Sequence, residues 1–458
     1  MVYSWQKQYR FIMRIRHLYF IVCFLALTGT QAVLAEDANH DELPQVLTID
    51  EAVRLALENN LNLRRSALDV QTRQRNADRS WNTLLPNISA SAMASHPSSI
   101  TGPIEPADRN VWTPGFSLSA GLTFSTSIIE NIKGAKADYE LGLLSYDSAR
   151  QELELQVRKL FYQIILLDAN RELADLNFAS AQDRYERSAA RVSVGQAPRL
   201  DELSARVDME NQRPSLRNAE LVYENALDSF KAILGLPSET IIHLDGSLTG
   251  EFNESFSTAG SALNTSLEAA SLAKSIQSLE AQRNAIRNNA YIPNLRLSWS
   301  STPLYNIPNE LWSDNGSFSI TLGINLDNFF PWSSAKTQIE NLNNNIQSVQ
   351  LQLTDSLRNQ ENRINNNVRI IERIVESLEA TMLNVDLAQS TYVLYEEAYR
   401  MGAADFQQLR SAGDSLNQAR NSLLQEQYNL ISALLDLEKE LNIPFGALWS
   451  TASSGVEE

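Results

Sequence analysis

Two patterns of hydrophobic and polar residues alternate along this chain. Apolar residues recur at alternating steps of three and four over Ile339–Tyr399, and the same spacing runs over Tyr139–Leu167. A three-four spacing sustained over so many turns is typical of helices that pack as coiled coils. At about 1.5 Å per residue, a helix over about 333–399 would be roughly 100 Å long, far deeper than an ordinary globular core.

Four short segments alternate every second residue instead, which is the pattern of a strand with one apolar face. In one of them Phe116, Leu118 and Ala120 are separated by serines. Each segment is about nine to eleven residues long, the length that crosses a bilayer at a tilt. We predict strands at about 87–96, 115–126, 294–302 and 317–327.

A proline stands where each helical pattern changes into a strand pattern. Pro86 lies in "LLPN" and Pro293 lies in "YIPN", 207 positions further on. Proline lacks the N–H that continues a helix, and it pushes the preceding residue towards extended geometry. We therefore predict that a helix ends and a strand begins at each of these prolines.

The two prolines belong to an internal repeat with a shift of 207, which also superposes Gly195 on Gly402. Each repeat is predicted to run helix, strand, strand, very long helix, helix. Local shifts of 202 and 200 occur between the repeat ends. They predict a loop of different length and about seven extra residues, two turns, in the second long helix. We divide the chain into a signal peptide at 1–35, repeats at 36–250 and 251–447, and a tail at 448–458.

The N-terminal segment has the pattern of a secretory signal peptide, with basic residues, an apolar run over 18–27 and small residues before position 36. Its start is either Met1 or Met13, and the alternative to cleavage is an uncleaved anchor. Cleavage removes Cys23, the only cysteine, and leaves 34 basic against 55 acidic residues, a net charge of about −21. This composition excludes disulfides and argues against nucleic acid as a partner. It also predicts a pore that favours cations.

Residues with catalytic chemistry are sparse. The three histidines of the mature chain, His40, His96 and His243, are isolated in the sequence. No spacing suggests a metal site, a catalytic triad or a phosphate-binding glycine loop. We predict no enzyme activity, no cofactor and no metal, so that any transport draws its energy from a partner.

The apolar faces of the four strands can be buried in two ways, against a soluble protein core or against lipid. A soluble core would produce the same alternation. However, each helix already has its own narrow apolar stripe, which leaves lipid to cover the strands. Four strands cannot close a barrel, and an open edge in hydrocarbon leaves backbone groups unsatisfied. Several chains would then share one barrel. The rival interpretation is a secreted structural coiled-coil or adhesin-like protein whose strands form a small soluble sheet.

The duplicated plan and its motifs resemble the TolC-like outer membrane efflux proteins. The resemblance rests on "LLPN" and "YIPN", on "GINLDNFFPWSSAKTQIENL", on the turns "VSVGQAPRLDELSAR" and "YRMGAADFQQLRSA", and on the ends "ILGLP" and "ELNIP". It implies a homotrimer whose chains supply four strands each to a twelve-stranded barrel in the outer membrane, continued by a helical tunnel across the periplasm. It also implies an exit duct for an efflux or type I secretion system, served by a periplasmic adaptor and an inner-membrane pump.

The resemblance assigns roles to the two turns that reverse the long helices. Val194 and Gly195 in the first turn, and Met401 and Gly402 in the second, match the tips that dock onto an adaptor. Glycine permits the left-handed conformation that such turns require.

The resemblance also places a pore gate next to these tips. Asp201 and Tyr399 match gating positions, and a hydrogen bond between them is the candidate latch. The alternative is that Tyr399 is the last residue of the apolar stripe and Asp201 a first-turn helix acid. Where some relatives carry an acidic pair, this chain has Gln408 and Ser411, which leaves Asp405 as a further gate candidate.

Overall fold

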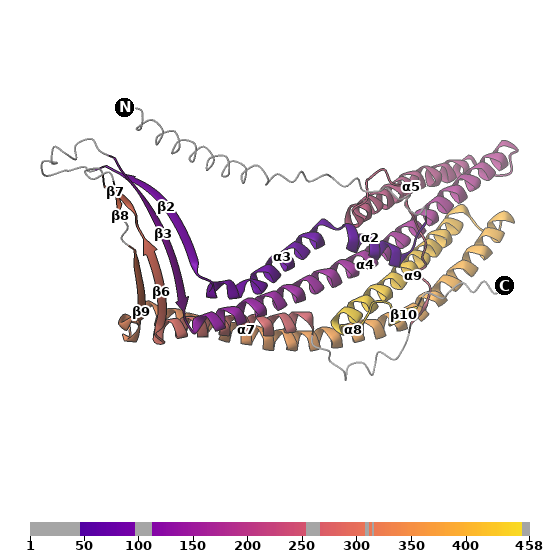
Figure 1. Ribbon diagram of the computed structural model, residues 1–458. Coiled ribbons are helices and arrows are strands. Elements are labelled where there is room, and N and C mark those ends of the chain that lie inside the picture. The colour runs from indigo at the N-terminus through magenta and orange to yellow at the C-terminus, as the bar shows by residue number, and fades with distance from the viewer. Residues whose placement is uncertain (1–45, 97–111, 253–265, 307–310, 314–315, 451–458) are drawn as a thin grey trace, which may run out of the picture. The chain divides into compact units, whose positions relative to one another are not determined.

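The computed structural model forms a mainly helical chain with one six-stranded sheet and two small two-stranded sheets among the described residues (Figure 1). The predicted signal peptide and nearly all of the predicted tail lie outside the described residues. Their boundaries, like those of the two repeats, stay predictions. The described residues are 46–96, 112–252, 266–306, 311–313 and 316–450.

The first half contains two short helices, a pair of strands and a pair of long helices. A capping box formed by Thr48 and Glu51 begins the first helix, and the side chain of Asn60 caps the next one. The elements of the first half are β1 (Val46–Leu47), α2 (Ile49–Asn59), α3 (Leu61–Asp78), the 3₁₀ helix η1 (Ser80–Leu84), β2 (Asn87–Ser95), β3 (Thr113–Phe124), α4 (Ser127–Ser193), α5 (Arg199–Leu234) and β4 (His243–Leu244).

Among the described helices of both halves, none combines the length and apolarity of a membrane-spanning helix. The second half again places its strands between a shorter helix and a pair of long helices. The elements of the second half are β5 (Glu251–Phe252), α7 (Leu267–Tyr291), β6 (Asn294–Ser301), β7 (Leu304–Asn306), β8 (Leu311–Ser313), β9 (Ser317–Gly323), the 3₁₀ helix η2 (Leu326–Phe329), α8 (Ser334–Arg400), α9 (Phe406–Glu440) and β10 (Trp449–Ser450).

The two long helices have the same length. Both α4 and α8 contain 67 residues, about 100 Å at 1.5 Å per residue. The prediction of extra residues in the second long helix is therefore wrong. The additional residues lie in the connection before it, because only residues 125–126 join β3 to α4 whereas residues 324–333 join β9 to α8.

The same connection corrects the predicted fourth strand. β9 ends at Gly323 rather than near 327, and the chain then turns through η2. Asn328 explains the turn, because its buried side-chain nitrogen donates to the carbonyl oxygen of Ala290 at 3.1 Å. The ring of Phe329 meets that of Tyr291 edge-on at 5.5 Å. These contacts tie the turn to the end of α7, and Ser333 then caps α8.

The four longer strands form one antiparallel sheet in the order β2-β3-β6-β9, with β7 and β8 continuing beside β3. The register gathers the hydroxyl groups on one face, where Ser89 faces Ser119 and Ser298 faces Ser319, each with 2.7 Å between the Oγ atoms. The other face is apolar and exposed, with Phe318 at 65% and Leu322 at 73% exposure. The period-two pattern thus separates two chemically different faces.

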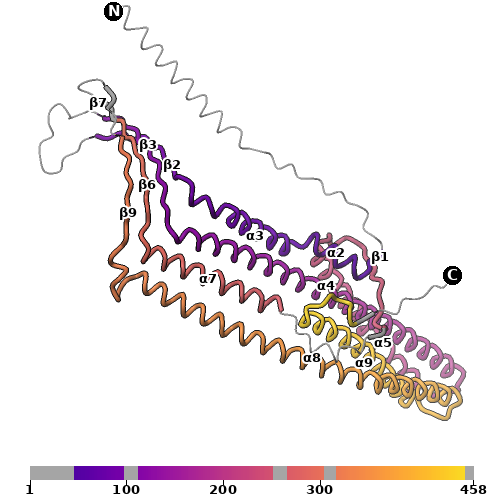
Figure 2. Tube along the Cα trace, turned by 60° about the horizontal axis from the view of Figure 1, so that its bottom comes forward, coloured from indigo at the N-terminus to yellow at the C-terminus, as the bar shows by residue number. Residues whose placement is uncertain are grey.

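The helices pack as antiparallel pairs. α4 packs along α5 and α7, and α8 packs along α9 and α7, as both views show (Figures 1 and 2). Their fully buried side chains include Phe161 of α4 and Phe230 of α5, with 6.3 Å between the ring centroids, and Leu434 and Leu437 of α9.

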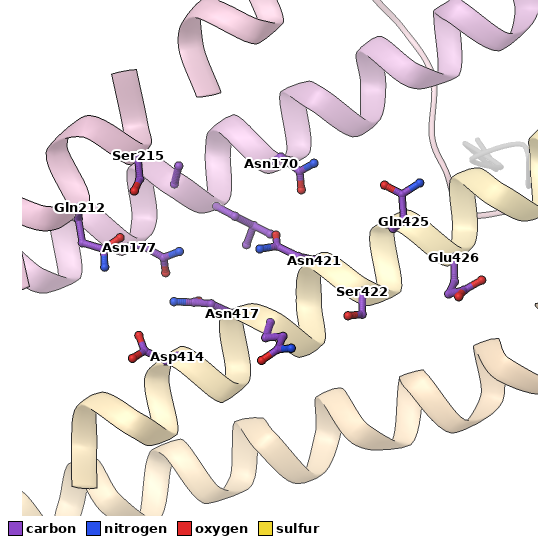
Figure 3. A pocket seen from close by; sticks show the side chains of 13 residues that line it. Asn170, Asn177, Gln212, Ser215, Asp414, Asn417, Asn421, Ser422, Gln425 and Glu426 are labelled. Atoms are coloured by element: carbon purple, nitrogen blue, oxygen red, sulfur yellow. The ribbon is translucent and has the colours of Figure 1, made fainter. Parts of the chain in front are cut away.

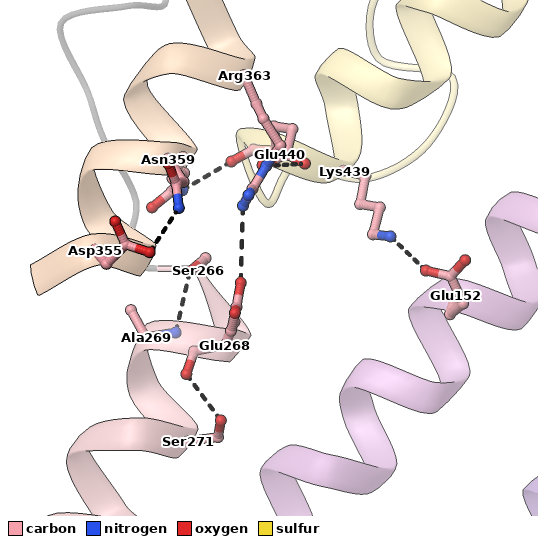
Figure 4. Close-up of polar contacts among 11 residues, drawn as sticks. Glu152, Ser266, Glu268, Ala269, Ser271, Asp355, Asn359, Arg363, Lys439 and Glu440 are labelled. Atoms are coloured by element: carbon pink, nitrogen blue, oxygen red, sulfur yellow. Dashed lines mark hydrogen bonds and ion pairs between the residues drawn. The ribbon is translucent and has the colours of Figure 1, made fainter. Parts of the chain in front are cut away.

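A polar cluster fastens the end of α9 to its neighbours (Figure 4). Arg363 of α8 binds Glu440 at 2.9 Å and Glu268 of α7 at 3.7 Å, while Lys439 pairs with Glu152 of α4. These contacts join α9 to α8 and α4, and α8 to α7, at the level where α7 begins.

Directly before Lys439 in α9, Glu438 is completely buried. It accepts hydrogen bonds from the backbone N–H groups of Gly446 at 2.9 Å and Leu448 at 2.7 Å. Burial raises the pKa of its carboxyl group, and the backbone hydrogen bonds partly offset that effect. Glu438 therefore holds the segment that follows α9 against the helix.

Candidate functional site

The two turns at the far ends of the long helices have the same backbone construction. Gly195 and Gly402 end α4 and α8 with φ angles of +75° and +77°. The N–H of Gln196 donates to the carbonyl of Arg191, and the N–H of Ala403 to that of Ala398, both at 2.8 Å. Together with the bonds from the glycine N–H groups to Val192 and Tyr399, these are Schellman motifs.

Each turn presents an apolar side chain to solvent immediately before its glycine. Val194 is 66% exposed and Met401 is 71% exposed. An added Cβ at either glycine would meet no atom within 4 Å, so the left-handed φ alone demands glycine there. Exposed apolar side chains on a rigid turn can serve as a contact surface, and the docking role of these four residues stays a prediction.

The candidate gate residues lie beside the turns in different environments. The ring of Tyr399 contacts that of Phe406 edge-on at 6.2 Å, and the guanidinium of Arg191 lies over it at 5.6 Å. Within the described part of this single chain, no hydrogen bond joins Tyr399 to Asp201. Asp201 sits in the first turn of α5, where a carboxylate stabilises the helix N-terminus. The latch between them stays a prediction.

Asp405 has a structural role of its own. Its side chain accepts a hydrogen bond from the N–H of Gln408 at 2.8 Å, and the Gln408 side chain accepts one from the N–H of Asp405 at 3.0 Å. This capping box begins α9. Gln408, one of the two positions where the sequence differs from the acidic pair that the resemblance implies, is thus part of the cap.

The two helix-to-strand breaks lie where the prolines stand. β2 begins directly after Pro86 and β6 directly after Pro293. The preceding residues are extended, with φ and ψ of −87° and 149° at Leu85 and −107° and 131° at Ile292. The first break differs in one respect, because η1 separates the end of α3 from the strand.

Comparison with known proteins identifies this arrangement. Residues 52–236 match the sequence profile of the family described as outer membrane efflux protein. The CmeC outer membrane channel of Campylobacter jejuni shares the fold with a TM-score of 0.72 at 16% identity, covering 86% of this chain and 85% of that one. The chain is similar to the outer membrane efflux proteins, in sequence over residues 52–236 and in fold over most of its length.

Further solved structures share the fold of this chain. VceC of Vibrio cholerae matches with a TM-score of 0.72 at 15% identity, over 87% of this chain and 96% of that one. MtrE of Neisseria gonorrhoeae, in its open state, matches with a TM-score of 0.71 at 17% identity, over 86% and 89%. No curated protein sequence matches the chain. At these identities the structures establish the fold alone.

These matches confirm the resemblance to TolC-like proteins that the sequence motifs indicate. The matched family is described as outer membrane efflux proteins, and CmeC, one of the structural matches, is an outer membrane channel. Among the described residues of this chain, no cluster of His, Cys, Asp and Glu could hold a metal ion.

The sheet carries one formal charge among its described strands. Arg296 lies on the hydroxyl face of β6, directly opposite Thr123 of β3 and Thr321 of β9. It is two residues from the strand start at Asn294, at the edge of the sheet nearest the helices. Sequence reasoning did not single out this charge.

Exposed aromatic side chains flank the same edge. Trp81 lies in η1, while Phe330 and Trp332 follow η2 with their rings stacked at 5.1 Å. All three are at least 49% exposed. Tryptophan is enriched at membrane–water boundaries, because its amphipathic ring can contact lipid and water at the same time. This edge therefore has the chemistry of a membrane interface.

A second feature is a polar cavity of about 780 Å³ between the two helical pairs (Figure 3). The Oδ1 atom of Asn170 in its wall is buried without a hydrogen-bond partner. Besides the carboxylates of Asp414 and Glu426, the wall consists largely of amide side chains, which can both donate and accept and are readily hydrated. The amides come from α4, α5 and α9 and include Asn170, Asn177, Gln212, Asn417, Asn421 and Gln425.

Proposed function

We propose that three copies of this efflux protein assemble into one barrel and tunnel, which forms the exit duct of a tripartite efflux or type I secretion system. The observation that carries the proposal is the sheet. Among the described strands, β2 pairs only with β3 and β9 pairs only with β6. In hydrocarbon those two free edges would leave backbone groups unsatisfied, so neighbouring copies must pair them.

The two faces of the sheet support the same assembly. The apolar face with Phe318, Ile320 and Leu322 suits lipid, and the serine face suits water in a lumen. Four strands from each of three copies make a twelve-stranded barrel, the number that the TolC-like resemblance implies.

The helices also offer surface for neighbouring copies. Leu383, Leu387 and Leu394 of α8 are exposed along one stripe, as are Leu200 and Leu203 of α5. Stripes at coiled-coil spacing bury their apolar side chains against another helix. Packing of these stripes between copies would close the tunnel below the barrel.

The tips and the gate complete the duct. An adaptor protein of the periplasm docks onto the turns with Val194, Gly195, Met401 and Gly402, and it connects the duct to an inner-membrane pump that supplies the energy. Tyr399, assisted by acidic residues near the same end, constricts the pore until docking opens it.

Cross-linking between the strand edges tests the assembly. The mature chain has no cysteine of its own, so a bismaleimide linker can act only on introduced pairs. Ser91→Cys in β2 with Ser317→Cys in β9 should yield covalent trimers on denaturing gels. The matched control, Ser119→Cys with Ser300→Cys, places both cysteines on directly opposed positions of one chain and should leave monomers.

The purified protein should also be a trimer in mild detergent and conduct ions in planar bilayers. A monodisperse monomer without conductance, or a protein soluble without detergent, would refute the channel and favour the structural coiled-coil interpretation.

A further inference from the structure

A stretch of α4 near the tip replaces the expected apolar stripe with polar side chains. Arg184, Ser188 and Arg191 stand at positions i, i+4 and i+7, so they share one face of the helix. That face borders a cavity of about 360 Å³ against α8 and α9, whose wall also contains Val393, Tyr399, Arg400 and Leu409. A coiled-coil seam would place leucine or isoleucine at such positions.

Two buried hydrogen-bond donors in this wall lack an acceptor. Ser188 is 2% exposed, and its Oγ has no hydrogen-bond partner. The Nε of Arg184 is likewise buried and unpaired, although its Nη2 donates to the buried Asp208 at 2.9 Å. Native proteins satisfy nearly all buried donors, so an orphaned pair one turn apart requires an explanation.

The side chains that line the wall include more guanidinium groups than carboxylates. Four arginines line it, namely Arg184, Arg187, Arg191 and Arg400, against Glu396 and Glu397. Glu397 lies 3.4 Å from Arg400, and Arg187 pairs with Asp183 outside the cavity.

Arg191 is different from the other three arginines. Among the described residues its guanidinium faces the ring of Tyr399 and forms no ion pair. Glu396, in the same wall, also forms none. Arg191 and Glu396 therefore balance in formal charge. The feature that is complementary to an oxyanion is the pair of orphaned donors together with the guanidinium of Arg191 in the same wall.

We propose that this cavity binds a small organic anion bearing a carboxylate or another oxyanion group. Ser188 Oγ and Arg184 Nε donate to the oxyanion, and Arg191 neutralises its charge. Val393 and Leu409 contact the organic body of the ligand. A volume of about 360 Å³ exceeds the needs of a bare inorganic anion and lies in the range of small-molecule sites.

The ligand would connect the two helical pairs. Arg184 and Arg191 belong to the α4–α5 pair, whereas Tyr399 and Arg400 belong to the α8–α9 pair. An anion held between them stabilises the arrangement in which these pairs lie together. This inference uses only the contacts of one chain and does not depend on the proposed assembly.

Calorimetric titration of the full-length protein in detergent tests the proposal, with benzoate as the organic probe and inorganic phosphate as the second arm. Saturable binding of benzoate is the expected result. Ser188→Ala should weaken that binding about tenfold or more, because a hydrogen bond to a charged group is lost. Without ligand the same variant should be at least as thermally stable as the wild type, since it removes an orphaned hydroxyl.

Two further variants distinguish binding at this cavity from nonspecific attraction of the anion to positive charge. Arg191→Gln should weaken benzoate binding about tenfold or more, while the matched control Arg217→Gln removes the same charge from an exposed position of α5 and should leave it unchanged. Binding of phosphate alone would overturn the organic ligand, and absence of saturable binding by either probe would mean that water satisfies the two donors. Equal weakening by Arg191→Gln and Arg217→Gln would overturn the site.

Discussion

The buried carboxylate of Glu438 provides a sharp test of the packing at the end of α9. Glu438→Ala removes the acceptor for two backbone N–H groups. The N–H of Leu448 would stay buried without a partner, which costs about 1–3 kcal/mol, while the exposed Gly446 can turn to water and loses about 0.5–1.5 kcal/mol. We expect the variant to lose about 2–4 kcal/mol of unfolding free energy, measured by guanidinium denaturation in detergent and followed by circular dichroism.

Glu438→Gln separates hydrogen bonding from charge. The glutamine keeps the size and one acceptor oxygen, so it should lose less stability than alanine. Burial raises the pKa of Glu438 in the folded state, so the folded protein binds this proton more tightly than the unfolded chain does. The stabilisation from this group therefore grows as pH falls from the raised pKa towards about 4.3, the unfolded value, and is absent at higher pH.

Comparison of the wild type with Glu438→Gln across pH isolates the contribution of the Glu438 carboxyl group, because the two proteins share all other carboxyl groups. The wild type should gain stability relative to Glu438→Gln as the pH falls below 7. A difference that does not change with pH, or a Glu438→Ala variant as stable as the wild type, would refute the reasoning.

Three further predictions concern the channel. Gly195→Val forces a β-branched residue into a left-handed φ at a cost of about 1–2 kcal/mol; it should reduce cross-linking to the adaptor while trimers persist, and unchanged cross-linking would exclude this turn as a docking site. Tyr399→Ala should raise bilayer conductance more than Tyr399→Phe, because only alanine removes the ring contacts with Arg191 and Phe406; equal effects would assign the gate to the hydroxyl group. Arg296→Ser should shift reversal potentials towards stronger cation selectivity, because it removes the one charge on the serine face; an unchanged potential would show that the tunnel, not the barrel, sets selectivity.

The sequence predicts the long helices and the breaks well, because their signals are local and strong. Proline at 86 and 293 acts on its own neighbours, and a three-four stripe over Ile339–Tyr399 outweighs any single residue. The length of α8 is harder to predict from the sequence. The local shift of 200 placed the extra residues inside the helix, whereas the contact between Asn328 and Ala290 places them in a turn.

The tip region shows a different limit. The glycine turns follow from sequence because left-handed φ angles require glycine. The cavity beside them does not, since it depends on which faces of α4, α8 and α9 meet. The signal was present in the spacing of Arg184, Ser188 and Arg191, where polar residues occupy an otherwise apolar stripe.

The equal lengths of α4 and α8 place the turns at their ends at equal distances from the sheet. Both helices start beside the same edge of the sheet and run for 67 residues, so their tips lie at the same depth along the helix direction. Three copies would then offer six tips on one level rim to a partner approaching end-on. One extra turn in a single helix would displace its tip by about 5.4 Å and leave three tips out of reach. Insertions or deletions in these helices should therefore be tolerated only when both change together.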